Sequence, residues 1–312
     1  MVEAATVWFL ITAAACFLVA GTLAPFETLA WWVGRLTPQD ELIAAPQAGA
    51  SDIRHFVIYL GGINAIDGKT LSHRELRFLK ALEAGLPSAK LVCSVFPYAA
   101  SGEPLLQAPR VFRWMWRLAA RRRKHRRTLL KYLIDWRNFY QVLVSADRRY
   151  GPVFNEAVAS LMLRALVEEG WRHGATQRVS IVGFSAGAQI AIASASYLGR
   201  VLDTPPAVVS IGGVILTTRG VDELARLDHL VSSADLLPRL SSFLSVARWP
   251  IAALSPWRKA LRLGRLRMAD MGVMHHSGPN GYLGEAASAQ PDMQNWRVTL
   301  AATLTCLATP DR

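Results

Sequence analysis

Apolar and polar positions follow two different periods along the chain. Continuous apolar runs bounded by glycine, proline or polar residues are typical of buried strands, and such runs occupy residues 56–60, 91–96, 178–182, 208–211 and 229–232. Between these runs, apolar residues recur at helical spacing, which predicts helices over residues 71–84, 153–169, 188–198 and 296–307. Strands that alternate with helices predict a mostly parallel sheet with helices on both faces, which is an α/β fold.

The N-terminal part of the chain differs from the rest in its hydrophobicity. Residues 4–24 contain no charged side chain; Trp8 lies near one end of the run, and Trp31 and Trp32 follow the other end. At about 1.5 Å per residue the run covers roughly 30 Å, which is enough for a helix to cross a bilayer core. We therefore predict a transmembrane anchor within residues 1–35, a linker over 36–51 and one globular domain over 52–312. A cleaved signal peptide and a buried helix are the alternatives, and Arg35 after the run favours a cytoplasmic domain.

The net charge of +12 is concentrated in two stretches of the chain. Residues 108–137 contain eleven lysines and arginines and one acidic residue, and residues 239–268 contain seven and none, whereas the remainder holds 17 basic and 22 acidic residues. These stretches fall in two inserts, over about 98–137 and 239–268, that interrupt the alternation of strands and helices. Tryptophans accompany the arginines in both, a combination typical of contact with an anionic membrane surface. A solvated face with packed aromatic side chains is the alternative, and nucleic-acid binding is not favoured because no known binding motif accompanies the charge.

Ser185 lies in a sequence that suits a nucleophile. Residues 183–187 read Gly-Phe-Ser-Ala-Gly and join the predicted strand at 178–182 to the predicted helix at 188–198. Such a sharp strand-to-helix turn exposes the serine hydroxyl, and the small residues two positions before and after it let the strand and the helix meet. A serine becomes nucleophilic only with a base within hydrogen-bond reach, an acid that orients the base, and donors for the oxyanion. An incidental serine in a glycine turn is the alternative interpretation.

With this turn the chain resembles the α/β-hydrolase family over residues 52–308. In that family the acid and then the histidine base follow the serine along the chain, on loops after later strands. The resemblance implies Asp235 as the acid, because it lies just after the short apolar strand at 229–232. Asp222 and Asp228 are rivals that fall before or within that strand, and a helix N-cap is the other interpretation of Asp235.

The base is expected among the two histidines that follow Asp235, which are His275 and His276. Residues 277–282 are rich in turn formers and can hold a histidine over the edge of the sheet. We predict His276 as the base because it adjoins this turn, with His275 as the alternative.

The family also places a backbone N–H donor for the oxyanion on the loop after an early strand. The glycine pair after the predicted strand at 56–60 matches this place, although Leu60 stands where the family often has a histidine. The resemblance implies Gly62 or Ile63 as one donor and Ala186 as the other. A plain glycine turn is the alternative.

Together these residues predict a membrane-anchored serine esterase or lipase-like enzyme that works through an acyl-enzyme. Its substrate is expected to be an apolar acyl ester or a lipid, and the two inserts are expected to form lids over the nucleophile, as insertions at these places often do in the family. No metal or organic cofactor is implied, since the chain has no HExxH motif and no phosphate-binding loop. The alternative function is a catalytically idle α/β-hydrolase scaffold that serves as a membrane-bound interaction module.

Overall fold

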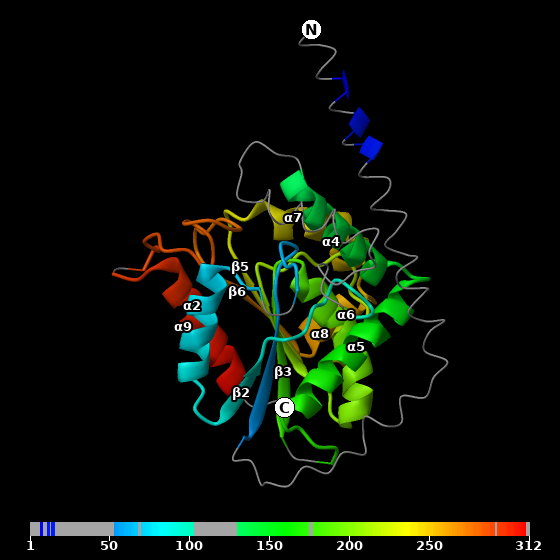
Figure 1. Cartoon of the computed structure of the whole chain (residues 1–312), viewed down its shortest axis with the longest axis vertical. Coiled ribbons are helices and arrows are strands. Elements are labelled where there is room, and N and C mark those ends of the chain that lie inside the picture. The colour runs from blue at the N-terminus through cyan, green and yellow to red at the C-terminus, as the bar shows by residue number, and fades with distance from the viewer. Residues whose placement is uncertain are drawn as a thin grey trace.

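The computed structural model has a six-stranded sheet at its centre. It describes residues 7, 8, 11, 12, 14, 15, 53–67, 70–102, 130–174, 177–290 and 292–309. The strands are β1 (His55–Leu60), β2 (Ala89–Val92), β3 (Arg178–Phe184), β4 (Ala207–Ile211), β5 (Arg226–Val231) and β6 (Leu266–Asp270). They lie in the order β2-β1-β3-β4-β5-β6, and each neighbouring pair is parallel. The predicted α/β class with a mostly parallel sheet is therefore confirmed (Figure 1).

Helices cover both faces of this sheet (Figure 1). On one face lie α2 (His73–Ala84) and α9 (Asn295–Ala308), which pack against each other. The other face carries α4 (Leu130–Ala146), α5 (Gly151–Glu168), α6 (Gly187–Leu202) and α8 (Pro256–Arg262). The short helix α7 (Leu236–Leu244) follows β5 at the carboxyl end of the sheet.

The central strands are apolar throughout because both of their faces are buried. In β1, the side chains of Phe56, Ile58 and Leu60 enter the core on the side of α5 and α6. Val57 and Tyr59 enter the core on the side of α2 and α9. All five side chains are at most 2 % exposed, which explains why a continuous apolar run, and not an alternating one, predicts this strand.

The second predicted strand, over residues 91–96, is shorter in the structure because part of the apolar run is a buried loop. The apolar run at 91–96 predicts a strand, but β2 ends at Val92. Val95 and Phe96 are only 5 % and 2 % exposed, although they belong to a loop. The apolar run therefore reflects the burial of both the end of β2 and the loop that follows it.

The edge strand β6 is not predicted by the apolar pattern. It begins within the insert expected over 239–268, and only its first residue, Leu266, is buried. A strand that exposes most of its side chains has no continuous apolar run, so the sequence gives no signal for it. The same insert contains α8, in which Trp257 is buried. The other insert, expected over about 98–137, lies largely outside the described residues, and its last part belongs to α4.

The prediction of a membrane location is wrong. Across the described residues, no helix combines the length and the apolar composition that crossing a bilayer requires. The longest of these helices, α5, has 18 residues and packs against α6. The anchor and the linker expected within residues 1–35 and 36–51 lie almost wholly outside the described residues.

Candidate active site

Ser185 stands between the last residue of β3 and the first residue of α6, in a strained backbone conformation. Its φ is 56°, which is the left-handed region that residues other than glycine seldom adopt. Two backbone hydrogen bonds join it to β4 and the loop after β4: its N–H donates to Ile211 O at 2.9 Å, and its carbonyl accepts from Val214 N at 3.1 Å. The next strand, β4, and the loop after it therefore fix the turn.

The glycines on either side of Ser185 are required by close approach of the backbone. A Cβ at Gly183 would lie 2.5 Å from the Ala188 Cα atom, and a Cβ at Gly187 would lie 2.4 Å from the Leu60 carbonyl oxygen. Any side chain at these positions would push α6 away from β3 and β1. The packing of this turn therefore requires both glycines of the Gly-Phe-Ser-Ala-Gly sequence.

Three side chains that are distant in the chain form one hydrogen-bonded series next to this turn. Ser185 Oγ lies 2.6 Å from His276 Nε2, and His276 Nδ1 lies 2.7 Å from Asp235 Oδ2. His276 is partly exposed, whereas Ser185 and Asp235 are 6 % and 1 % exposed. The structure therefore brings the predicted nucleophile, base and acid together in the expected order. His275 is exposed, and its backbone N–H bonds to Asn280 O at 2.8 Å.

Asp235 has a second contact that fixes its carboxylate. It is the N-cap of α7, because Oδ1 accepts a hydrogen bond from Leu237 N at 3.0 Å. The N-cap interpretation and the contact with His276 therefore hold at the same time, through different oxygens. The rival carboxylates are engaged elsewhere: Asp222 lies 3.1 Å from Lys259, and Asp228 lies within 2.7 Å of two arginines, Arg226 and Arg267.

The loop that carries His276 is tied to the end of β5. Ser232 Oγ accepts from Met274 N at 2.7 Å and lies 2.7 Å from the carbonyl oxygens of both Gly272 and Met274. Ser232 N in turn donates to the Tyr282 hydroxyl at 2.8 Å. Burial, and then the charge of Asp235, raise the pKa of Tyr282 far above its ordinary value, so this hydroxyl stays protonated.

Aromatic stacking orients the imidazole from the other side. The Phe184 ring lies against the His276 ring with centroids 5.9 Å apart and an angle of 18° between the planes. The residue before the serine therefore restricts the imidazole, while Asp235 fixes its Nδ1. Together these contacts leave Nε2 directed at Ser185.

The loop after β1 lies against Ser185, as an oxyanion-binding loop requires. A Cβ at Gly62 would lie 3.5 Å from the Ser185 Cβ atom. The Tyr98 hydroxyl donates to Gly61 O at 2.8 Å, and because C=O and N–H point in opposite directions across a trans peptide, the Gly62 N–H points away from Tyr98. Within the described part of the chain, the N–H groups of Gly62, Ile63 and Ala186 have no hydrogen-bond acceptor.

Similarity to known proteins is confined to three-dimensional structure. Neither a protein-family profile nor a curated protein sequence matches the chain. Among solved structures, a dienelactone hydrolase-like promiscuous phosphotriesterase from metagenomic libraries is 13% identical, with a TM-score of 0.44 over 84% of this chain and 87% of that chain. The acyl-protein thioesterase 2 of Zea mays is 13% identical, with a TM-score of 0.42 over 85% of this chain and 97% of that chain. A dienelactone hydrolase from Anabaena variabilis is 13% identical, with a TM-score of 0.36 over 81% and 83%. At these identities the likeness concerns the fold alone.

Two residues that support the site have no signal in the sequence. Asn138 Nδ2 donates to Ile63 O at 2.7 Å and to Ala65 O at 2.8 Å, which holds the loop after β1. Tyr98 holds the same loop through Gly61. Asn138 belongs to α4 and Tyr98 to the loop after β2, and neither stands at a characteristic spacing from Ser185. Only the folded arrangement reveals them.

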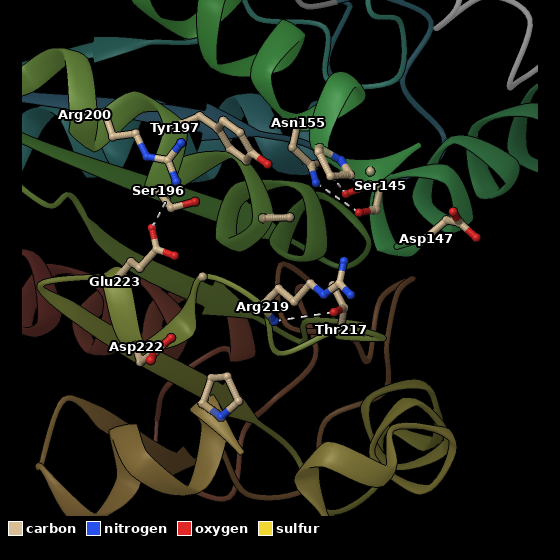
Figure 2. Close-up of a pocket in the computed structure, with 15 residues that line it drawn as sticks. Ser145, Asp147, Asn155, Ser196, Tyr197, Arg200, Thr217, Arg219, Asp222 and Glu223 are labelled. Atoms are coloured by element: carbon tan, nitrogen blue, oxygen red, sulfur yellow. Dashed lines mark hydrogen bonds and ion pairs between the residues drawn. The ribbon is translucent and has the colours of Figure 1, made fainter. Parts of the chain in front are cut away.

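A separate cavity of about 300 Å³ lies where α5, α6 and the short helix η3 (Val221–Glu223) meet (Figure 2). Two of its charged side chains, Arg200 and Glu223, pair with each other. Arg200 lies 3.8 Å from Glu223 and 5.0 Å from the centre of the Tyr197 ring. None of the three hydrogen-bonded side chains of the candidate site lines this cavity.

Proposed function

We propose that the protein is a serine hydrolase that cleaves acyl esters through an acyl-enzyme, with Ser185 as nucleophile, His276 as base and Asp235 as the orienting acid. The observation that carries this proposal is the continuous hydrogen-bonded series from Ser185 Oγ through the imidazole to Asp235, at 2.6 Å and 2.7 Å. The strained φ of Ser185 supports it, because backbone strain in a non-glycine residue persists where the surrounding structure enforces it, often at reactive sites.

The geometry suits the two half-reactions of acyl transfer. Ser185 Oγ attacks the acyl carbonyl carbon while its proton passes to His276 Nε2, and the carbonyl oxygen becomes an oxyanion. Collapse of this intermediate breaks the ester bond, and the leaving alcohol takes the proton from His276. Water then attacks the acyl-enzyme with the same proton movements, which releases the acid and restores the serine. Asp235 stabilises the imidazolium through its contact with Nδ1.

The oxyanion is stabilised by backbone donors that need no reorganisation. The candidates are the N–H groups of Ala186 and of Gly62 or Ile63. Gly62 is supported by its position against Ser185 and by the fixed orientation of its peptide unit. Asn138 and Tyr98 act here as positioning residues, because they hold the carbonyl oxygens of this loop.

An apolar acyl group is the favoured substrate. The helix α7 begins directly after Asp235 and exposes a row of large apolar side chains, which are Leu236, Leu240, Phe243 and Leu244. They are between 54 % and 70 % exposed. An apolar surface that starts at the acid of the site can cover an acyl chain and remove it from water.

The test is ester hydrolysis by purified variants with short acyl esters. Ser185→Ala and Asp235→Asn are expected to lower kcat by about 10³-fold or more, because the three residues act as a unit. The matched control is Ser180→Ala, which removes a buried serine of β3 that also contacts a histidine, His55. It is expected to keep its activity. Full hydrolysis by Ser185→Ala, or an equal loss in Ser180→Ala that retains its fold, would contradict the proposal.

A further inference from the structure

A second cavity, of about 270 Å³, lies between α7 and the carboxyl ends of β5 and β6. We call it the α7 pocket, and its polar lining includes His229, Ser232, Arg239, Ser242, Arg248 and Asp270. Neither Ser185, His276 nor Asp235 lines it. Nothing in the proposed hydrolysis uses this pocket, so its function has to be inferred from its own chemistry.

Arg248 is a buried cation without a paired carboxylate. Its side chain is only 9 % exposed, and its guanidinium lies over the Trp257 ring at 4.3 Å from the centroid. Its hydrogen bonds, to Ile215 O at 3.4 Å and to Ser241 Oγ at 3.5 Å, are long, and Nε has no partner among the described residues. No described carboxylate oxygen lies within ion-pair distance of it.

Arg226, a second buried arginine, has the carboxylate partner that Arg248 lacks among the described residues. Arg226 is similarly buried, and its Nε donates to Asp228 at 2.7 Å. Burying a cation removes its hydration, and a carboxylate partner normally offsets this cost. Arg248 has only neutral oxygens and an aromatic ring. Burial lowers the pKa of Arg248 to about 10, so the side chain is still charged at neutral pH.

His229 is a second buried polar residue of the α7 pocket, and one of its ring nitrogens has no hydrogen-bond partner among the described residues. Its ring is fully buried, and its Nδ1 lies 2.9 Å from Ser210 Oγ, while Nε2 has no partner among the described residues. Burial, and then the charge of Arg248, lower the pKa of His229 to about 3, so the ring is neutral. When Ser210 donates to Nδ1, the Nε2–H is a free donor.

The mouth of the pocket also favours a negative ligand. Arg239 is exposed there and donates to Ser233 O at 3.4 Å, which leaves most of its donors open. The acidic residue of the lining, Asp270, is exposed, and its Oδ1 accepts from Gly272 N at 2.9 Å. By contrast, in the cavity of Figure 2 both Arg200 and Asp222 have oppositely charged partners.

We propose that the α7 pocket binds a small oxyanion, of the phosphate or carboxylate class, with Arg248 as its buried anchor. The guanidinium offers parallel N–H donors that match two oxygens of such an anion. The Ser242 hydroxyl and Arg239, which also line the pocket, complete the donor set. This site goes beyond the proposed hydrolase activity and does not depend on it.

The test is a calorimetric titration of the full chain with inorganic phosphate and, separately, with acetate, at constant ionic strength. Saturable binding of phosphate, of acetate or of both supports the site and identifies the class of anion. Arg248→Gln is expected to weaken this binding about 10- to 100-fold, since hydrogen bonds to charged groups are the strong ones. Arg239→Gln at the mouth is expected to weaken it about two- to fivefold.

Two further variants keep the test decisive. Arg219→Gln, an exposed arginine of the cavity in Figure 2, is the matched control and is expected to leave binding unchanged. Met268→Trp places a large ring in the α7 pocket from the exposed edge strand and is expected to abolish binding. This variant keeps Arg248, so it tests the pocket independently if Arg248→Gln does not fold. The proposal is overturned if neither anion binds the wild type saturably, or if a folded Arg248→Gln or Met268→Trp variant binds as tightly as the wild type.

Discussion

Serine–histidine hydrogen bonds occur both at the carboxyl end of the sheet and inside it. At the end of β3, Ser185 Oγ lies 2.6 Å from His276. Inside the sheet, Ser180 Oγ lies 2.8 Å from His55, and Ser210 Oγ lies 2.9 Å from a third ring, that of His229. The distances are similar, so the serine–histidine contact alone does not distinguish a reactive pair from a structural one.

The surroundings of the two kinds of pair differ in the group on the far side of the imidazole and in burial. His276 contacts Asp235 through its second nitrogen and is partly exposed. In the described part of the molecule, His55 and His229 have no carboxylate partner, and both are buried. Burial lowers the pKa of His55 to about 4 and that of His229 to about 3.

This difference teaches what a serine needs in order to react. A base with a pKa near 3 or 4 has little tendency to take a proton at neutral pH, and no acid stabilises the cation that would form. Ser180 and Ser210 also lie in regular strands, whereas Ser185 lies in the turn after β3 with a φ of 56°. The contact with Asp235, the partial exposure of His276 and the backbone turn at Ser185 distinguish the candidate site from the two internal pairs more than the serine–histidine hydrogen bond does.

The largest expected effect separates His276 from its chain neighbour. His276→Ala should lower kcat for acyl esters by about 10³-fold or more, nearly matching the loss of the serine. His275→Ala should stay within a few-fold of the wild type, because His275 is exposed and its backbone, not its ring, contacts Asn280. Steady-state kinetics of both variants measures this difference. If His275→Ala lost its hydrolytic activity while His276→Ala retained it, His275 and not His276 would be the base.

An intermediate effect is expected on stability, from the internal pairs. The folded protein keeps His55 and His229 neutral, whereas the unfolded chain binds protons at these side chains below about pH 6.5. Stability contributed by the neutral rings is therefore present above pH 6.5 and is lost as the pH falls toward 4. At pH 5 each ring should lower the free energy of unfolding by about 2 kcal/mol relative to pH 7 or above.

Urea unfolding at pH 7 and pH 5 measures this dependence. His55→Gln should remove about half of the contribution from the two rings, because the substituted side chain does not titrate. His73→Gln, at an exposed position, is the control and should leave the pH dependence as it is. An unchanged pH dependence in a folded His55→Gln variant would show that the internal ring is not held neutral.

The smallest expected effect separates the two contacts of Asp235. One oxygen contacts His276 and the other caps α7. Asp235→Asn keeps an oxygen for the cap, whereas Asp235→Ala removes it, so the Ala variant should be about 1 kcal/mol less stable than the Asn variant. Both should lose hydrolysis. Equal stabilities in chemical denaturation would mean that the cap contributes nothing measurable.

The sequence predicts the centre of the fold and the local chemistry better than it predicts the edges. β1 and β3 are recognisable because both faces are buried, and the turn at Ser185 is recognisable because its chemistry is local. β6 exposes most of its side chains and so lacks an apolar run. Asp235 and His276 could be inferred only with the chain order of the resembling family.

The remaining contacts depend on residues far apart in the chain. Asn138 reaches the loop after β1 across 75 residues, from a helix that begins in a stretch recognised only by its charge. Arg248 belongs to the second basic stretch, where a pattern of arginines and tryptophans suggests surface, yet both it and Trp257 are buried. Charge counts do not reveal which member of a basic segment the fold turns inward.

Covalent labelling by a fluorophosphonate probe tests the central claim most directly, because such a probe reacts with a serine only where the base and the oxyanion donors activate it. Purified protein is labelled and digested, and the modified serine is located by mass spectrometry. The account predicts one labelled position, Ser185, with labelling lost in Ser185→Ala and retained in Ser180→Ala and Ser210→Ala. Labelling that persists in Ser185→Ala, or a folded wild type that takes no label, would contradict it.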